Sequence, residues 1–132
     1  MNFTGTILLV DDEPHIRKYV SLILRQLGAP RILEASNGQE GLAVFTAEQP
    51  DLVLLDVNMP IMDGIETLKK LKEADPDCIV IMLTSLANRQ TIEEALSLGA
   101  ANYIRKDTPK EEIARALTET IDACFEPDSP SP

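Results

Sequence analysis

The sequence is poor in aromatic side chains, and it has no tryptophan. Aromatic residues make up 4% of its 132 residues, so a folded core has to be built from leucine, isoleucine, valine, alanine and methionine. The hydrophobic content of 44% is sufficient for such a core, which argues against a wholly disordered chain. The length corresponds to one domain.

Long apolar runs are also missing. No run approaches the roughly 20 residues that a membrane span needs. Residues 1–5 lack the basic and apolar regions of a signal peptide. The only cysteines, Cys78 and Cys124, lie far apart in the sequence. We therefore expect a cytoplasmic protein that makes no membrane contact and whose two thiols are free.

Basic residues are scarce in comparison with acidic ones. The chain has 12 lysines and arginines against 22 aspartates and glutamates, a formal net charge of −10. Because lysine and arginine supply most of the affinity for nucleic-acid phosphates, this domain is not expected to bind DNA or RNA directly. Two interpretations of the negative charge remain: it serves solubility alone, or some of the carboxylates converge on a cation.

Short apolar runs alternate with longer amphipathic stretches along the chain. The runs are Thr6–Val10, Arg31–Leu33, Leu52–Leu55, Cys78–Leu83 and Asn102–Ile104. Continuous apolar runs, without polar residues at every second position, are typical of strands that are covered on both faces. The pattern therefore predicts a parallel sheet with helices on both sides.

Capping signals mark the helices between these runs. Ser36 with Gln39, Asp63 with Glu66, and Thr108 with Glu111 have the spacing of N-terminal capping pairs. The first helix is expected over Pro14–Leu27 and the last over Pro109–Phe125, with Pro109 at the first helical position. Gly28 and Gly99 stand where a helix would end in a left-handed residue.

Five strand–helix repeats predict an α/β fold. We expect a five-stranded parallel sheet in the order 2-1-3-4-5, a flavodoxin-like, doubly wound (βα)5 sandwich of three layers. This domain should occupy residues 1–125. Residues 126–132 are rich in proline and serine and are expected to form a disordered tail or the start of a linker.

Polar side chains that can bind a ligand or take part in a reaction follow four of the five predicted strands. Asp11 and Asp12 follow the first strand, Asp56 the third, Thr84 the fourth and Lys106 the fifth. The carboxyl ends of the strands are where open α/β sheets bind their ligands. Each residue alone would be an ordinary turn residue, helix cap or solvated lysine, but the joint pattern predicts one site.

Carboxylates that are gathered in this way need a cation. Two like charges 4 Å apart repel by about 4 kcal/mol at an effective dielectric of about 20, so such a cluster shifts its pKa values or binds a metal. Oxygen ligands without histidine or cysteine suit Mg²⁺. A nearby hydroxyl and ammonium group would complete a site for phosphoryl transfer.

Several stretches around these residues resemble the receiver domain of two-component response regulators, which has a chemotaxis-regulator-like fold. The resemblance covers about residues 5–124. It is carried by Ile-Leu-Leu-Val-Asp-Asp-Glu-Pro at 7–14, Asp-Leu-Val-Leu-Leu-Asp-Val-Asn-Met-Pro at 51–60, Met-Asp-Gly at 62–64, Leu-Thr-Ser at 83–85 and Gly-Ala-Ala-Asn-Tyr-Ile-Arg-Lys at 99–106.

The resemblance implies the roles of the site residues. Asp56 corresponds to the phosphoacceptor. Asp11 and Asp12, together with Asp56 and the backbone carbonyl of Asn58, correspond to the ligands of Mg²⁺.

The remaining roles belong to residues of the last two strands. Thr84 corresponds to the switch hydroxyl and Tyr103 to the aromatic side chain that moves with it. Lys106 corresponds to the lysine that pairs with the phosphoryl group. Asp107 departs from the family, in which a proline, often after a cis peptide bond, follows this lysine.

The resemblance also implies the partners. A histidine kinase or phosphotransfer protein should phosphorylate the domain, and phosphorylation should change the surface of the fourth helix, fifth strand and fifth helix for a downstream effector. The resemblance also allows a homodimer that forms on phosphorylation, although Ala101-Asn102 replaces the acidic pair on which one subgroup builds such a dimer. The domain is expected to be a regulator rather than an enzyme, although it assists its own phosphorylation and dephosphorylation.

Asn58 and Leu86 should flank the approach of the water that hydrolyses the aspartyl phosphate. The apolar side chain of Leu86 predicts slow dephosphorylation.

Two other functions compete with this one. A haloacid-dehalogenase-like phosphatase also uses an aspartyl phosphate, a threonine, a lysine and Mg²⁺. Its nucleophile follows the first strand, however, whereas here an acidic pair precedes Asp56. A pseudo-receiver that only binds a partner would be expected to lack a site residue, and none is lost.

Overall fold

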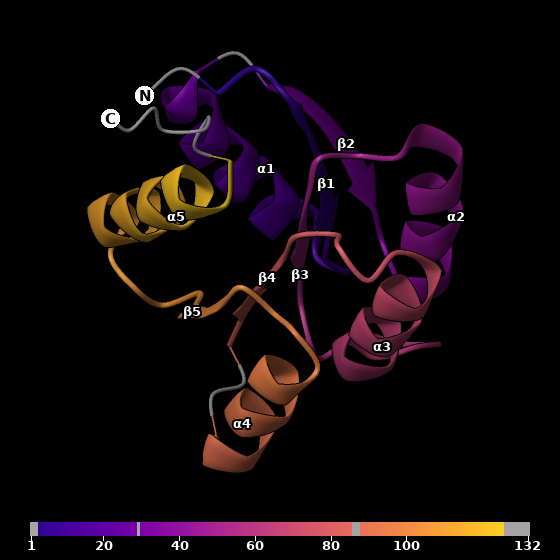
Figure 1. The fold of residues 1–132 in the computed structure, drawn as a ribbon. Helices are drawn as coiled ribbons and strands as arrows, with labels where there is room; N and C mark the ends of the chain where they lie inside the picture. Colours follow the sequence, from indigo (N-terminus) through magenta and orange to yellow (C-terminus); the bar gives the residue numbers. More distant parts are fainter. Residues whose placement is uncertain (1–2, 29, 86–87, 126–132) are drawn as a thin grey trace, which may run out of the picture.

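A five-stranded parallel sheet lies at the centre of the structure, a computed structural model that describes residues 3–28, 30–85 and 88–125 (Figure 1). The order of its strands is β2-β1-β3-β4-β5, as the sequence predicts. The strands are β1 (Thr6–Val10), β2 (Arg31–Ala35), β3 (Leu52–Leu55), β4 (Val80–Thr84) and β5 (Asn102–Arg105). The predicted flavodoxin-like (βα)5 fold is confirmed.

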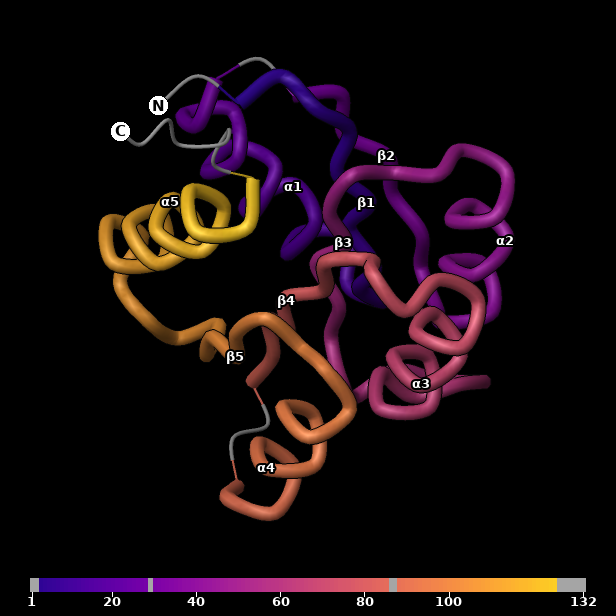
Figure 2. Tube along the Cα trace, viewed as in Figure 1, coloured from indigo at the N-terminus to yellow at the C-terminus, as the bar shows by residue number. Residues whose placement is uncertain are grey.

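Helices cover both faces of this sheet. They are α1 (Pro14–Leu24), α2 (Gly38–Glu48), α3 (Gly64–Ala74), α4 (Arg89–Ser97) and α5 (Lys110–Phe125), with a short 3-10 turn, η1 (Arg25–Leu27), after α1. The tube in Figure 2 shows α1 and α5 on one side of the sheet, with α2 and α3 on the other. No helix in the described part of the chain is long and apolar enough to cross a membrane.

Each face of the sheet has its own aliphatic core. Leu8, Val53 and Met82 belong to the core beneath α2, α3 and α4. Their neighbours Ile7 and Leu54 belong to the core beneath α1 and α5. Successive strand residues point to opposite faces, so a strand buried on both sides has to be apolar at every position. This explains the continuous apolar runs.

The predicted start of α2 is wrong by one residue. The N-cap of α2 is Asn37, whose side chain accepts a hydrogen bond from the Glu40 N–H at 2.8 Å, whereas the capping pattern favours Ser36. Asparagine caps a helix as well as serine does, so the two candidates compete within one residue of each other. The predicted cap of α3 by Asp63 is confirmed.

The first helix is shorter than predicted and the last begins one residue later. Helix α1 ends at Leu24, and the chain continues to Leu27 as a 3-10 turn. Helix α5 begins at Lys110, and the carbonyl of Pro109 before it accepts the N–H of Ile113 at 3.0 Å, the first hydrogen bond of the helix. Helix ends often tighten into 3-10 geometry, which periodicity alone does not show.

The strand ends differ from the predictions as well. Strand β2 extends to Ala35, β4 begins at Val80, two residues later than expected, and β5 extends to Arg105. Both predicted left-handed glycines have positive φ, but Gly28, with φ 143° and ψ −135°, is not in the left-handed helical conformation. No cis peptide bond occurs in the described residues, so the Lys106–Asp107 bond is trans.

The structure also bears on the two cysteines and on the ends of the chain. Both cysteines are free, Cys78 buried and Cys124 exposed. The rings of Phe3 and Phe125, whose centroids are 5.6 Å apart, bring the two ends of the described chain together. The expected tail at 126–132 lies outside the described residues.

Candidate functional site

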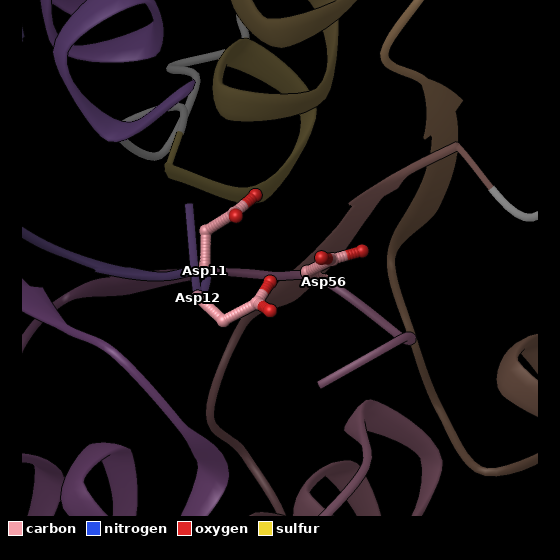
Figure 3. A group of neighbouring side chains, drawn as sticks. All are labelled: Asp11, Asp12 and Asp56. Atoms are coloured by element: carbon pink, nitrogen blue, oxygen red, sulfur yellow. The ribbon is translucent and has the colours of Figure 1, made fainter. Parts of the chain in front are cut away.

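Three carboxylates meet where β1 and β3 end, side by side in the sheet (Figure 3). Asp11 and Asp12 directly follow β1, and Asp56 directly follows β3. The Asp56 N–H donates to the carbonyl of Val10 at 3.0 Å, which fixes the two strand ends to each other. Carboxylate oxygens of the three residues lie within 4.8 Å of one another. Asp11 and Asp56 are 2% and 3% exposed, so their charges are largely withdrawn from water.

Lys106 brings the one ammonium group that the described structure shows in contact with this cluster. Its Nζ lies 2.6 Å from Asp11 Oδ2 and 3.1 Å from Asp56 Oδ2, and its side chain is 11% exposed. Residue 106 is held in place by its own N–H, which donates to the carbonyl of Thr84 at 3.0 Å. Three carboxylates and one ammonium leave a formal charge of −2, which favours a further cation.

Burial and neighbouring charges shift the pKa values of Asp11 and Lys106. Burial raises the pKa of the Asp11 carboxyl, although a hydrogen bond from Lys106 acts in the opposite direction. Burial alone would lower the pKa of the Lys106 ammonium, but Asp11 and Asp56 outweigh it and raise that pKa. The lysine therefore stays charged at neutral pH, while Asp11 carries its charge at a cost.

One oxygen of Asp56 has no hydrogen bond. Its Oδ1 is buried and, among the described residues, accepts nothing, whereas its Oδ2 accepts from Lys106. A buried acceptor without a partner is costly and needs an explanation such as an ion. The unpaired oxygen, the cluster within 4.8 Å and the absence of histidine and cysteine from its ligands together fit Mg²⁺.

Thr84 and Tyr103 lie on the last two strands of the sheet. Thr84 is completely buried at the end of β4. Tyr103 is partly buried on β5 and packs against the core beneath α2, α3 and α4. Burial, and to a lesser degree the negative charge of Asp56, raises the pKa of the Tyr103 hydroxyl.

The loop after β3 carries Asn58, which is exposed. It turns back at Gly64, whose N–H donates to the carbonyl of Val57 at 2.8 Å. Thus one end of α3 is fixed directly beside Asp56. Leu86, predicted to flank the water's approach, lies outside the described residues.

Two residues near the cluster, Glu13 and Arg17, are not predicted from the sequence as part of the site. Glu13 Oε1 lies 3.6 Å from the Nζ of Lys106, and its position next to the acidic pair is a usable signal. Arg17 donates from Nη1 to the backbone carbonyl of Asp11 at 2.7 Å. No spacing rule marks such a contact, because it depends on how α1 packs beside β2.

Known proteins resemble this chain in sequence. The family model of the response regulator receiver domain matches residues 7–118. The sporulation initiation phosphotransferase F of Bacillus subtilis is 39% identical over 115 residues, which is 87% of this chain and 92% of that protein. The nitrate/nitrite response regulator NarL of Escherichia coli K12 is 39% identical over 116 residues, 86% of this chain. Those residues are 53% of NarL, so the chain spans about half the length of that relative.

Solved structures agree with these sequence matches. A chain of the CheX–CheY–BeF3–Mg²⁺ complex from Borrelia burgdorferi superposes with a TM-score of 0.82 at 29% identity, over 91% of this chain and 88% of that chain. The chain belongs to the response regulator receiver family, and it is a phosphoacceptor signalling switch of a two-component system.

Proposed function

We propose that Asp56 is the residue that accepts the phosphoryl group, with Mg²⁺ bound beside it. The observation that carries the assignment is the buried Oδ1 of Asp56, which has no hydrogen-bond partner among the described residues although a lysine holds its other oxygen. A carboxylate with one oxygen free of hydrogen bonds has lone pairs available for a new partner, a metal ion or phosphorus.

The transfer needs one bond to form and one to break. A carboxylate oxygen of Asp56 attacks the phosphorus of a phosphorylated histidine on the donor, and the phosphorus–nitrogen bond breaks as the imidazole leaves. The Lys106 ammonium, 3.1 Å from Asp56, pairs with the phosphoryl oxygens, and the Thr84 hydroxyl donates to another. The ammonium and the hydroxyl stabilise the negative charge of the phosphoryl oxygens, which the three carboxylates alone would repel.

Asp11, Asp12, Asp56 and the backbone carbonyl of Asn58 would hold the metal. Mg²⁺ prefers one or two carboxylates and keeps several waters, and Asp12 is the member of the cluster most open to solvent. The ion would supply positive charge that neutralises phosphoryl oxygens. In this proposal residues 1–125 form the receiver domain.

Replacing Asp12 with alanine is expected to weaken Mg²⁺ binding to the unphosphorylated protein by at least about tenfold, because a ligand is lost. Isothermal titration of the wild type, Asp12→Ala and the exposed control Asp77→Ala measures it. Equal affinities in all three would remove the metal from this cluster.

Replacing Asp56 with asparagine is expected to abolish phosphorylation by a small-molecule phosphodonor in the presence of Mg²⁺. The amide has nearly the shape of the carboxylate but is a poor nucleophile. Intact mass spectrometry detects the added phosphoryl group, and Asp51→Asn, in an exposed position before β3, is the matched control. A phosphorylated Asp56→Asn protein would refute the assignment.

Phosphorylation is expected to reorganise the face formed by α4, β5 and α5. New acceptor oxygens on Asp56 would draw the Thr84 hydroxyl toward them, and Tyr103 would occupy the vacated space. Chemical shifts on addition of a beryllofluoride mimic should change at Tyr103 and along α4. Changes confined to the strand ends would contradict a switch on this face.

The partners and the fate of the phosphoryl group follow from the same proposal. A histidine kinase or phosphotransfer protein would load Asp56, and an effector would bind the changed face or a second copy would dimerise on it. A cytoplasmic location and self-catalysed dephosphorylation belong to this proposal. No observation favours the phosphatase or the pseudo-receiver, since Asp56, Thr84 and Lys106 are all present at the strand ends.

A further inference from the structure

The side chain of Arg17 bridges helix α1 to two different strand ends. Its Nη1 donates to the backbone carbonyl of Asp11 at 2.7 Å. Its Nε donates to Glu34 Oε1 on β2 at 2.8 Å. The arginine side chain is 17% exposed and that of Glu34 is 48% exposed, so water competes less for the contact with Asp11 than for the one with Glu34. One planar guanidinium therefore fixes the end of β1 to the edge strand of the sheet.

The backbone of Asp11 is held on both of its sides. Its N–H donates to the carbonyl of Ala35, the last residue of β2, at 3.1 Å. Its carbonyl, which belongs to the peptide group that leads into Asp12, accepts from Arg17. The orientation of that peptide group determines where the Asp12 side chain leaves the backbone. Arg17 is therefore the group that limits rotation of the peptide between the two acidic residues.

We propose that Arg17 is a positioning residue for the metal site: through the Asp11–Asp12 peptide it aims the Asp12 carboxylate at the position of Mg²⁺, and Glu34 holds Arg17 in place. The inference rests on the proposed Mg²⁺ site. Groups that orient metal ligands without touching the metal commonly change the affinity by about 10–100-fold. The hydrogen bonds of Arg17 go to the Asp11 carbonyl and to Glu34, so its effect is on the metal ligand rather than on the phosphoacceptor.

A second arginine–glutamate pair lies at the opposite end of β2, away from the carboxylate cluster. Arg31 on β2 and Glu48 on α2 lie 3.1 Å apart, but their side chains are 59% and 41% exposed. Exposed pairs of this kind contribute about 0–1 kcal/mol. This pair serves as a matched control, since it has the same residue types and joins β2 to a neighbouring helix.

Direct titration of Mg²⁺ into the unphosphorylated protein tests the proposal without any phosphoryl transfer. Arg17→Met should bind Mg²⁺ roughly tenfold more weakly than the wild type. Arg17→Lys should recover part of the affinity, because one ammonium can reach the Asp11 carbonyl but cannot form both bonds of a planar fork. Arg31→Met should bind as the wild type does.

Denaturant unfolding of each variant without metal separates positioning from general stability. If Arg17→Met loses stability but keeps wild-type Mg²⁺ affinity, the positioning role is refuted. If Arg17→Met does not fold, Glu34→Ala replaces it in the test. This variant keeps the contact between Arg17 and the Asp11 carbonyl but removes the second partner of the guanidinium, so it should weaken Mg²⁺ binding by a smaller factor. An unchanged Mg²⁺ affinity in Glu34→Ala would also refute the positioning role. A wild type that binds no Mg²⁺ would refute the metal site itself, and the inference with it.

Discussion

Replacing Lys106 with methionine is expected to lower the free energy of unfolding by about 3 kcal/mol at neutral pH without divalent cations, because it leaves buried carboxylates unpaired. The Nζ of Lys106 lies 2.6 Å from Asp11 and 3.1 Å from Asp56, and both aspartates are almost fully buried. Methionine keeps most of the length of the side chain, so the loss reports the charge more than the packing.

The loss should depend on pH in a defined direction. The pKa of Lys106 is raised above its ordinary 10.5, so its stabilising contribution is complete below pH 10.5 and disappears only as the pH rises through the folded-state value. The pKa of Asp11 is raised above 3.8, so the charged Asp11 costs stability at neutral pH, and this cost disappears as the pH falls through the raised value. The deficit of Lys106→Met is therefore largest near neutrality and shrinks on acidification.

Mg²⁺ provides a second check on the same variant. The metal replaces the missing positive charge, so it should stabilise Lys106→Met more than the wild type, in which the ammonium already neutralises part of the negative charge. Chemical denaturation with and without Mg²⁺, with the exposed Lys70→Met as control, measures both effects. A double variant with Asp11→Asn should recover part of the loss. A Lys106→Met protein as stable as the wild type at neutral pH would show that the carboxylates do not depend on the lysine.

The second large effect is expected for Gly64→Ala, which should destabilise the protein by about 3 kcal/mol and disturb phosphorylation, since the added methyl group overlaps main-chain atoms. A Cβ on Gly64 would collide with the carbonyl oxygen of Asp56 and lie 2.7 Å from the Cα of Val57. Backbone cannot yield as a flexible side chain can, so the loop that follows the phosphoacceptor would have to move.

A matched glycine separates this collision from a general effect of alanine. A Cβ on Gly41, inside α2, would meet only side-chain atoms of Val10, the nearest at 3.0 Å, and alanine is favoured over glycine in a helix by about 1 kcal/mol. Gly41→Ala should thus change stability little. Denaturant unfolding and the initial rate of phosphorylation should be measured for both variants. If Gly64→Ala matches the wild type in both, the close packing of the loop on Asp56 is not required.

Much of the fold can be predicted because its signals are local and repeated. Continuous apolar runs identify β1, β3 and β4, and shorter apolar runs with polar residues at their ends identify the edge strands β2 and β5. Parallel strands bring their carboxyl ends to one edge of the sheet, so the order of residues along the chain is enough to place Asp11, Asp56 and Lys106 in one cluster. The ends of helices are less predictable. Ser36 and Asn37 are both good caps, and differences between such candidates are small against the packing that decides where α2 begins.

The finer geometry of the site cannot be predicted from spacing. That Lys106 pairs with Asp11 more closely than with Asp56 depends on the path of the chain after β5. The contact from Arg17 to the Asp11 carbonyl requires that α1 packs beside the end of β2, which is a long-range property. Periodicity reports which face of a helix is buried, but not which backbone carbonyl a buried polar group will reach.

The central claim, that Asp56 carries the phosphoryl group, is tested most directly by locating that group in the chain. The protein is incubated with a small-molecule phosphodonor and Mg²⁺ and treated with sodium borohydride, which reduces an acyl phosphate to an alcohol. Peptide mass spectrometry then identifies the reduced carboxyl group. We predict reduction at position 56 alone, dependent on the phosphodonor. Reduction at Asp11 or Asp12 with Asp56 unmodified would contradict the account.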